Sequence, residues 1–315
     1  MFTLLLLAAC SAPSGDDSGK ADDTGTPDAD GPKSAPLAAL SSGECPDLTA
    51  SGTSSFTSSG EARQVTIIVP ENPEPGMAVN FFFHGVTDPA STDNPGGETA
   101  AGLELQGEAD ATNTVWIVPD APVQDLYGMI SVYLWDLSLV QDHDLVLYDD
   151  LRTCVGEGLD VDLDRLSVVG FSGGALWSTV IVANRGDTLA TAVELSGGSD
   201  IEAPGFDDLF AEYITPTSDL PVLLTSGSAE ADVWPSASFV VVNFAEATDG
   251  LQAELAADGH FVVRCQDDGG HEMSRQEWNL AKDWLASAQF GEPSPYEADG
   301  LGGDDDWCAV VAAGE

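Results

Sequence analysis

Gly170-Phe171-Ser172-Gly173-Gly174 is the stretch that decides the fold of this chain. A strand-like run, residues 165–169, precedes it, and a helix-like run, residues 175–184, follows it. This is the G-x-S-x-G motif in the strand–turn–helix setting that it requires. Glycines at both ends of such a tight turn leave room for neighbouring backbone, so the serine hydroxyl stands exposed above the sheet, where the positive end of the following helix faces the reacting oxygen. Ser172 is therefore the candidate nucleophile.

Strand-like and helix-like segments alternate along the chain. The strand-like segments are 64–70, 78–83, 114–119, 166–170, 190–195, 221–225 and 260–265, and the helix-like segments are 142–156, 173–184, 239–257 and 276–289. This alternation predicts an α/β fold, a mostly parallel central sheet with helices on both faces. Ligands in such sheets bind beyond the carboxyl ends of the strands. The residues that follow those ends are His84, Ser172, Glu230, Asp232 and His271.

A serine hydroxyl needs a base to take its proton and an acid to hold that base in the right tautomer. His271 follows the last strand, after two glycines that allow its loop to fold back over the sheet edge, and it fits the chain order serine, acid, histidine. We expect it to be the base. His260, at a strand start, is expected to be structural. His143, at a helix start between two aspartates, is expected to belong to a helix cap rather than to a metal site.

The acid is open between two carboxylates. Both follow the strand at 221–225, where the acid belongs: Glu230 lies three residues after Gly227, and Asp232 directly precedes Val233-Trp234-Pro235. Either could orient an imidazole through its Nδ1–H, and the spacing favours Glu230 slightly.

An oxyanion hole needs two N–H donors. One is expected from Gly173, the residue after the nucleophile. The other is expected from the turn at Gly85 and Val86, since glycine lets the backbone turn its N–H groups inward. The side chain of His84 is expected to fix this turn.

Charge excludes several classes of partner. The chain has 54 acidic and 9 basic residues, a net charge of −45. Such a field repels nucleic acid and anionic membranes and disfavours polyanionic substrates.

The first ten residues read MFTLLLLAAC, an apolar run too short to span a bilayer. Leu7-Ala8-Ala9-Cys10 resembles the lipobox of bacterial lipoproteins, although no Lys or Arg precedes the run. We expect a signal peptide over 1–10, lipidation of Cys10 and export to the cell envelope or outside the cell, with membrane contact only through that anchor. Plain secretion and no export are the alternatives.

Three further segments follow. Residues 11–42 are rich in small and polar residues and predict a disordered linker. Residues 43–290 form the expected catalytic domain, and 291–315 form an acidic tail. The even count of cysteines after Cys10 predicts two disulfides, with all three pairings open; these cysteines are Cys45, Cys154, Cys265 and Cys308. A bond between Cys265 and Cys308 would tie the tail to the last strand. The sequence has no pattern that predicts a metal site.

Taken together, these motifs resemble those of α/β-hydrolase esterases, the group of polyhydroxybutyrate depolymerases and feruloyl or acetylxylan esterases. The resemblance covers about 65–285 and rests on four segments: Phe83-His84-Gly85, Asp144 with its helix to Cys154, Val161-Asp162-Leu163-Asp164-Arg165-Leu166 leading into the serine motif, and Gly259-His260-Phe261-Val262-Val263 leading to Gly270-His271.

This resemblance implies an α/β-hydrolase fold and ester hydrolysis without a cofactor, acting on a small or oligomeric ester. It implies a serine nucleophile, a histidine base and an aspartate acid, which fall on Ser172, His271 and Glu230 or Asp232. The usual Gly-x-x-Asp acid site departs here to Gly227-Ser228-Ala229-Glu230. A serine peptidase or lipase on the same fold, or a non-catalytic surface lipoprotein, are the alternatives.

Overall fold

The computed structural model describes residues 33–126, 128–203, 206, 209–210, 212–302 and 306–311. The signal peptide expected over 1–10, the lipidation expected at Cys10 and most of the expected linker lie outside the described residues.

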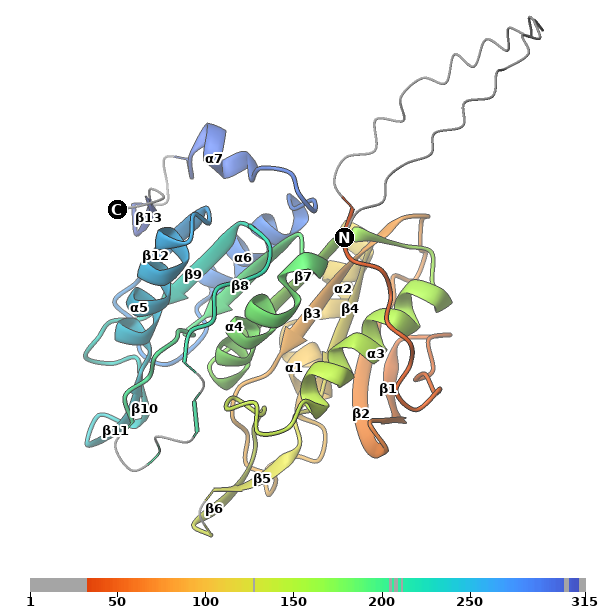
Figure 1. Cartoon of the computed structure of the whole chain (residues 1–315), viewed down its shortest axis with the longest axis horizontal. Helices are drawn as coiled ribbons and strands as arrows, with labels where there is room; N and C mark the ends of the chain where they lie inside the picture. Colours follow the sequence, from red (N-terminus) through yellow and green to blue (C-terminus); the bar gives the residue numbers. More distant parts are fainter. Residues whose placement is uncertain are drawn as a thin grey trace, which may run out of the picture. The chain divides into compact units, whose positions relative to one another are not determined.

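Nine of the described strands form one sheet in the order β1-β2-β4-β3-β7-β8-β9-β12-β13 (Figure 1). Its bounds are β1 Gly52–Ser58, β2 Glu61–Ile68, β3 Met77–Phe83, β4 Thr114–Pro119, β7 Val161–Phe171, β8 Thr191–Leu195, β9 Val222–Ser226, β12 Val262–Gln266 and β13 Cys308–Val311. The strands from β4 to β12 run parallel to their neighbours, while β1, β2 and β13 pair antiparallel. The predicted mostly parallel α/β sheet is confirmed.

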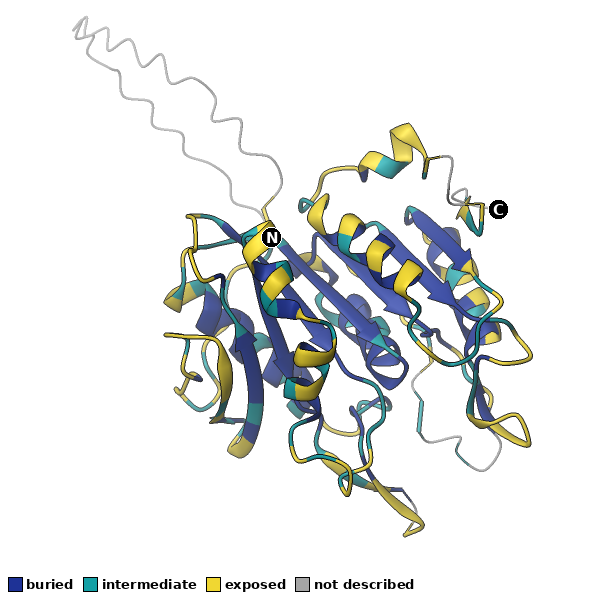
Figure 2. Ribbon diagram, turned by 180° about the vertical axis from the view of Figure 1, so that it is seen from behind, coloured by how far each residue is buried: buried dark blue, intermediate teal, exposed yellow. Residues whose placement is uncertain are grey.

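Helices cover both faces of this sheet, because the central strands are buried on both sides and read as continuous apolar runs. On one face the core includes side chains of α3 (His143–Gly158), α4 (Gly173–Arg185) and α5 (Phe244–Ala257). On the other it includes those of α1 (Pro95–Gly102), α2 (Leu105–Thr112) and α6 (Arg275–Ala286). Figure 2 shows the buried sheet between helices whose outer surfaces are exposed. A 3-10 turn (η1, Gly186–Thr188) and the short helix α7 (Pro295–Asp299) complete the described helices.

Two hairpins project from the same end of the sheet, beyond the ends of its strands (Figure 1). One consists of β5 (Val123–Leu126) and β6 (Ile130–Tyr133), and the other of β10 (Val233–Ser236) and β11 (Phe239–Asn243). The helix predicted over 239–257 is therefore wrong in its first five residues. The run Phe239-Val240-Val241-Val242 is β-branched after its first residue and pairs with β10 instead. The helix starts at Phe244, after Asn243 caps it by accepting a hydrogen bond from the Glu246 N–H.

The described end of the expected linker, residues 33–42, lies on the domain. Buried Arg152 donates to the carbonyl groups of Ala35 and Pro36, and Thr153 donates to that of Ala38. Asp150 accepts from the backbone N–H and the hydroxyl of Ser41. Polar contacts with α3, rather than burial of apolar side chains, thus hold residues 33–42 on the domain, which begins before residue 43.

Both expected disulfides are present, Cys45–Cys154 and Cys265–Cys308. The first ties the N-terminal segment to α3, and the second ties the C-terminal strand β13 to β12, with which it pairs antiparallel. Disulfides of this kind are typical of proteins in oxidising compartments, such as those of exported proteins. In the part of the chain that the structure describes, no helix has the length and apolarity needed to cross a membrane.

Candidate active site

Ser172 lies in the tight turn between β7 and α4 and has a left-handed backbone, with φ 56° and ψ −125°. Its N–H donates to the carbonyl of Leu195 on the neighbouring strand at 2.9 Å. The flanking glycines are required sterically. A Cβ at Gly170 would lie 2.1 Å from the Gly174 oxygen, and one at Gly174 would lie 1.9 Å from the Phe83 oxygen. A strained non-glycine residue of this kind costs about 1–3 kcal/mol and is typical of functional sites.

His271 joins the serine to a carboxylate. Its Nε2 lies 2.7 Å from the Ser172 Oγ, and its Nδ1 lies 2.7 Å from the Asp232 Oδ1. With Asp232 ionised, the Nδ1 carries the proton and the Nε2 is free to accept the serine proton. The structure therefore brings the expected nucleophile and base together with one of the two candidate acids.

Asp232 is completely buried. Its second oxygen, Oδ2, accepts from the Gly227 N–H at 2.9 Å and from the Ser196 hydroxyl at 2.8 Å. A buried carboxylate needs such donors to offset its desolvation. Ser196, directly after β8, is a site residue that the sequence analysis missed.

Glu230 is exposed, and no hydrogen bond between it and His271 occurs among the described residues. The sequence favoured Glu230 slightly on spacing, whereas the structure places Asp232 against the imidazole. The local reason is a turn: the Ser228 carbonyl accepts from the N–H groups of both Ala231 and Asp232, which returns residue 232 to Gly227.

Two aromatic rings and a loop contact fix the position of His271. Phe171 stacks on the imidazole at a centroid distance of 5.1 Å, and Phe244 does so at 4.1 Å and an interplanar angle of 6°. The Ser228 N–H donates to the Gly269 carbonyl at 2.9 Å, so the loop that carries the acid and the loop that carries the base are joined. Phe244 is also a residue that the sequence analysis did not assign to the site.

The three residues expected at the oxyanion hole lie together beside the nucleophile. A Cβ on Gly85 would lie 3.1 Å from the Ser172 Cβ, and one on Gly173 would lie 3.5 Å from the Val86 nitrogen. Within the described residues, neither the Val86 N–H nor the Gly173 N–H donates a hydrogen bond to another protein group. Both amides are thus candidate donors to an oxyanion on the substrate.

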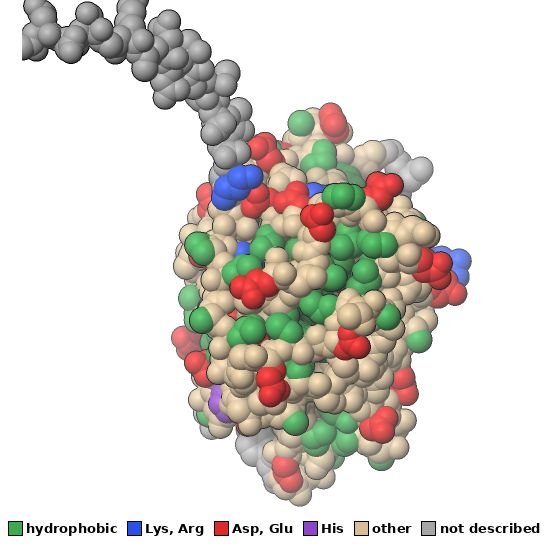
Figure 3. Space-filling view, turned by 90° about the vertical axis from the view of Figure 1, so that its right-hand side faces the viewer, with side chains coloured by type: hydrophobic (Ala, Val, Ile, Leu, Met, Phe, Trp, Pro, Cys, Tyr) green, Lys and Arg blue, Asp and Glu red, His purple; other side chains and the backbone are tan. Residues whose placement is uncertain are grey.

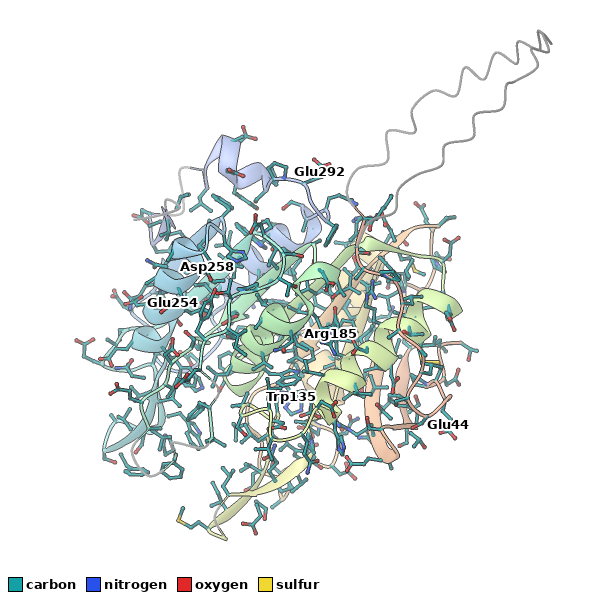
Figure 4. All side chains as sticks on the ribbon, viewed as in Figure 1. Glu44, Trp135, Arg185, Glu254, Asp258 and Glu292 are labelled. Carbon is teal, nitrogen blue, oxygen red and sulfur yellow. A yellow bond between two sulfur atoms is a disulfide. The ribbon has the colours of Figure 1, made fainter. Side chains whose placement is uncertain are left out.

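His84 is buried beneath this turn. Its Nδ1 lies 2.7 Å from the Gly85 carbonyl, and its Nε2 accepts from the Ala121 N–H at 3.0 Å. Burial lowers the pKa of His84 to about 4, so the ring is neutral and donates through Nδ1. The indole of Trp135, labelled in Figure 4, donates to the His84 carbonyl at 3.0 Å and stacks on Trp177 of α4. These contacts hold the turn that carries Gly85 and Val86.

The other two histidines lie away from Ser172. His143 is the first residue of α3, and its Nδ1 lies 3.3 Å from a carboxylate oxygen of Glu61. His260 is buried, and its Nδ1 lies 3.2 Å from the Leu220 nitrogen. Among the described residues, no group of three or more His, Cys, Asp or Glu side chains is arranged to hold a metal ion.

An apolar cavity opens on the serine. We call it the serine cavity. Both projecting hairpins contribute to its wall, and apart from Ser172 and Gly173 it is lined by hydrophobic side chains: Val86, Leu126, Leu134, Leu137, Leu176, Leu209, Phe210, Trp234, Val242 and Phe244. The apolar lining favours an uncharged group on the reacting atom.

The charge of the outer surface is mostly negative. On the face drawn in Figure 3, acidic side chains clearly outnumber basic ones, in keeping with the net charge of −45. The contrast between an acidic surface and an apolar cavity disfavours anionic ligands at the approach to the site.

Comparisons with known proteins bear on the fold. No family model matches the chain, and no curated protein matches it. Solved structures do match. The native crystal structure of pOPH has a TM-score of 0.63 at 18% identity, over 85% of this chain and 97% of that one. The chain has an α/β-hydrolase fold.

Two other similar structures are those of enzymes. A thermostable esterase has a TM-score of 0.55 at 16% identity, over 76% of this chain and 63% of that one. The S-formylglutathione hydrolase FrmB from Staphylococcus aureus has a TM-score of 0.51 at 16% identity, over 75% of this chain and 98% of that one. At this level of identity the likeness establishes the fold, and activity has to be argued from the site.

Proposed function

We infer that this protein is a serine-dependent carboxylic ester hydrolase. The observation that carries the proposal is the continuous hydrogen-bonded series Ser172–His271–Asp232, with both distances from the imidazole at 2.7 Å, at the wall of an apolar cavity. A nucleophile, a base within reach of it and a third group that orients the base are the parts that acyl transfer requires.

Acylation proceeds from this geometry. The Ser172 Oγ attacks the ester carbonyl carbon while the His271 Nε2 takes its proton, and the carbonyl π electrons move to the oxygen. The N–H groups of Gly173 and Val86 stabilise that oxyanion. When the tetrahedral intermediate collapses, the bond to the alcohol oxygen breaks and His271 returns the proton to the leaving alkoxide, which leaves as the alcohol. Asp232 stays ionised and stabilises the imidazolium.

Deacylation repeats the sequence with water. Water attacks the acyl carbon, His271 takes one of its protons, and the Ser172 oxygen leaves with that proton as the acid is released. Each group is restored, so the cycle consumes only ester and water. Every proton transfer uses a side chain of this chain, and the proposal needs no cofactor.

The proposed substrate is an uncharged ester, small or oligomeric, with an apolar acyl group. A polyhydroxybutyrate depolymerase-like or feruloyl esterase-like specificity is the finer proposal, and it rests on the sequence motifs. Nucleic acid is not a proposed partner, because the net charge of −45 opposes it. We further propose that the protein is exported, with Cys10 as a lipid anchor; the two disulfides support the oxidising compartment and not the anchor.

The departure from the usual acid site at Gly227-Ser228-Ala229-Glu230 is the feature that supports the non-catalytic alternative. The contact of 2.7 Å between the Asp232 Oδ1 and the His271 Nδ1 weakens that support, because it supplies the imidazole with a carboxylate partner. No feature of the described structure singles out a peptidase or a lipase.

The decisive experiment is hydrolysis of p-nitrophenyl acetate and butyrate by the purified protein and by Ser172→Ala. We expect the substitution to lower kcat by about 10⁴-fold or more, because the covalent route is lost. A folded protein that does not hydrolyse these esters, or whose turnover survives the substitution, would rule out the proposed mechanism.

The acid is tested with a matched pair of isosteric substitutions. Asp232→Asn should lower kcat by about 10³–10⁴-fold, because the amide cannot stabilise the imidazolium and favours the wrong tautomer. Glu230→Gln changes a carboxylate two residues away by the same chemistry and should change kcat by less than about twofold, since exposed loop substitutions have small effects. The reverse pattern would assign the acid to Glu230.

A further inference from the structure

The serine cavity is not isolated. A second cavity adjoins it, and the two share three apolar side chains, Leu137, Leu176 and Phe210. The shared side chains come from three separate parts of the chain: the loop before α3, helix α4 and the segment between β8 and β9.

Helix α4 runs along both cavities. Ser172, its N-cap, and Leu176 line the serine cavity, and Leu176, Val180 and Ala183 line the second one. These residues recur at intervals of three or four, so they lie on one face of the helix. The rise from Leu176 to Ala183 is about 10 Å at 1.5 Å per residue. One apolar stripe thus leads from the nucleophile, past Leu176, into the second cavity.

The position of His271 decides which half of an ester points that way. The leaving alcohol must receive its proton from the His271 Nε2, so it has to lie on the His271 side of the serine. Phe244, which stacks on that imidazole, lines the serine cavity and not the second one. The side of the serine cavity that carries Leu137 and Leu176, next to the second cavity, is left for the acyl group.

Part of the lining of the second cavity is polar. Asp200 and Glu212 are exposed at its border, and both Asn184 and Tyr213 contribute polar atoms. The carboxylates disfavour an acyl chain that ends in an anion. Val180, Ala183 and Leu139 supply apolar lining to the same cavity and suit a neutral hydrocarbon chain.

We propose that the second cavity is the distal part of the acyl-binding site, so that the enzyme accepts esters of long, uncharged acyl chains. Leu176 controls passage, and the residues at 180 and 183 set the longest chain that fits. This rests on the proposed esterase function and extends it to a substrate class.

The test uses p-nitrophenyl esters of acetate, butyrate, octanoate and dodecanoate, with kcat/KM measured for each. Ala183→Leu adds a branched side chain in the second cavity only. We expect the octanoate-to-acetate ratio of kcat/KM to fall by about tenfold, since loss of room for a few methylenes in a hydrophobic site is worth roughly this much. Val180→Ala enlarges the same cavity and should raise the dodecanoate-to-acetate ratio.

Two controls make the result specific. Ala253→Leu makes the same chemical change at an exposed position of α5 and should leave every ratio unchanged. Thermal unfolding checks that each variant is folded. If Ala183→Leu fails to fold, the proposal is tested by Val180→Ala alone, for which we expect a higher dodecanoate-to-acetate ratio.

The outcomes separate the two proposals. If the wild-type protein hydrolyses no ester, the proposed function fails. If acetate is hydrolysed through Ser172 but the ratios do not respond to positions 180 and 183, this inference alone is overturned. The same holds if the ratios respond instead to the length of the alcohol in a series of alkyl acetates, because the cavity would then hold the leaving group.

Discussion

Glu194 is a buried carboxyl group that no ion pair offsets among the described residues, and it makes stability depend on pH. It lies on β8, and its oxygens lie 2.9 and 3.0 Å from the Thr179 Oγ1 of α4. The Gly198 N–H donates to its Oε2 at 3.3 Å. Burial raises the pKa of Glu194 from 4.5 to about 8, and these hydrogen bonds offset only part of that effect.

The direction in which stability changes with pH follows from the linkage between proton binding and folding. Because the folded pKa is above the unfolded one, the folded protein keeps a proton that the unfolded chain releases between about pH 4.5 and 8. The contribution of the neutral Glu194 to the free energy of unfolding is fully present below the pKa of the unfolded chain, and it is lost as pH rises through the pKa of the folded protein. A full pH unit inside this window costs about 1.4 kcal/mol, and the slope falls off near the two pKa values, so about 3 kcal/mol is lost between about pH 5 and pH 8.

Glu194→Gln removes this titration and keeps the shape of the group. Its amide can donate to Thr179 and its carbonyl can accept from Gly198. We therefore expect the variant to gain about 3 kcal/mol relative to the wild type as pH rises from about 5 to about 8. Urea unfolding of both proteins at several pH values, with disulfides intact, measures the free energy of unfolding of each. The difference between the two proteins at each pH removes the contribution of the other carboxylates, which titrate alike in both.

A difference between the two proteins that stays constant over that range, within about 0.5 kcal/mol, would refute the reasoning. It would mean that Glu194 is already ionised in the folded protein at about pH 5, with a solvated or compensated charge.

Two further predictions concern the support of the site and of the C-terminal strand. Ser196→Ala removes one of the two donors to the Asp232 Oδ2, so kcat should fall by about tenfold and the free energy of unfolding by about 1–3 kcal/mol; an unchanged kcat in a folded variant would show that Gly227 suffices. Replacing both Cys265 and Cys308 with Ser opens a crosslink across a separation of 43 residues and should cost about 2–4 kcal/mol in urea unfolding. Ester hydrolysis through Ser172 should persist there, and its loss in a folded protein would contradict the view that β13 only secures the sheet edge.

Many of the strands and helices could be predicted from the sequence. The strands of a parallel sheet are continuous apolar runs, and the helices have apolar residues at intervals of three or four. The apolar side chains of the last helix, Trp278, Leu280, Trp284 and Leu285, are buried on one face of it. The motif at 170–174 also predicted where strand and helix meet. The segments that the sequence analysis missed, β1, β5, β6 and β10 among them, are hairpin or edge strands, where short runs and exposed faces leave little periodic signal.

The N-terminal boundary was hard for a different reason. Residues 33–42 have the composition of a disordered segment, and they bury few apolar side chains. They are held through backbone carbonyls that Arg152 and Thr153 reach from α3. Backbone groups are the same in every sequence, so composition carries no record of such contacts.

Spacing along the sequence could not decide between the two candidate acids. Glu230 and Asp232 are two residues apart in a chain full of carboxylates, and counting from Gly227 favoured the first. In the folded protein Asp232 is selected by donors from distant segments, since the Ser196 hydroxyl and the Gly227 N–H converge on one of its oxygens and His271 on the other.

The same residue also positions the base through its backbone. The Asp232 carbonyl accepts from the Phe244 N–H at 3.0 Å, and the ring of Phe244 stacks on the imidazole of His271. The carboxylate of residue 232 thus contacts the imidazole of the histidine, while its backbone carbonyl holds the residue whose ring packs against that imidazole. A carboxylate at 230 could not do both, because the turn at Ser228 brings residue 232, and not 230, to the start of α5. Which carboxylate meets the imidazole is therefore a property of the turn. Asp232→Asn should separate the proposed chemical role of this residue from its structural one, since the backbone contact survives the substitution.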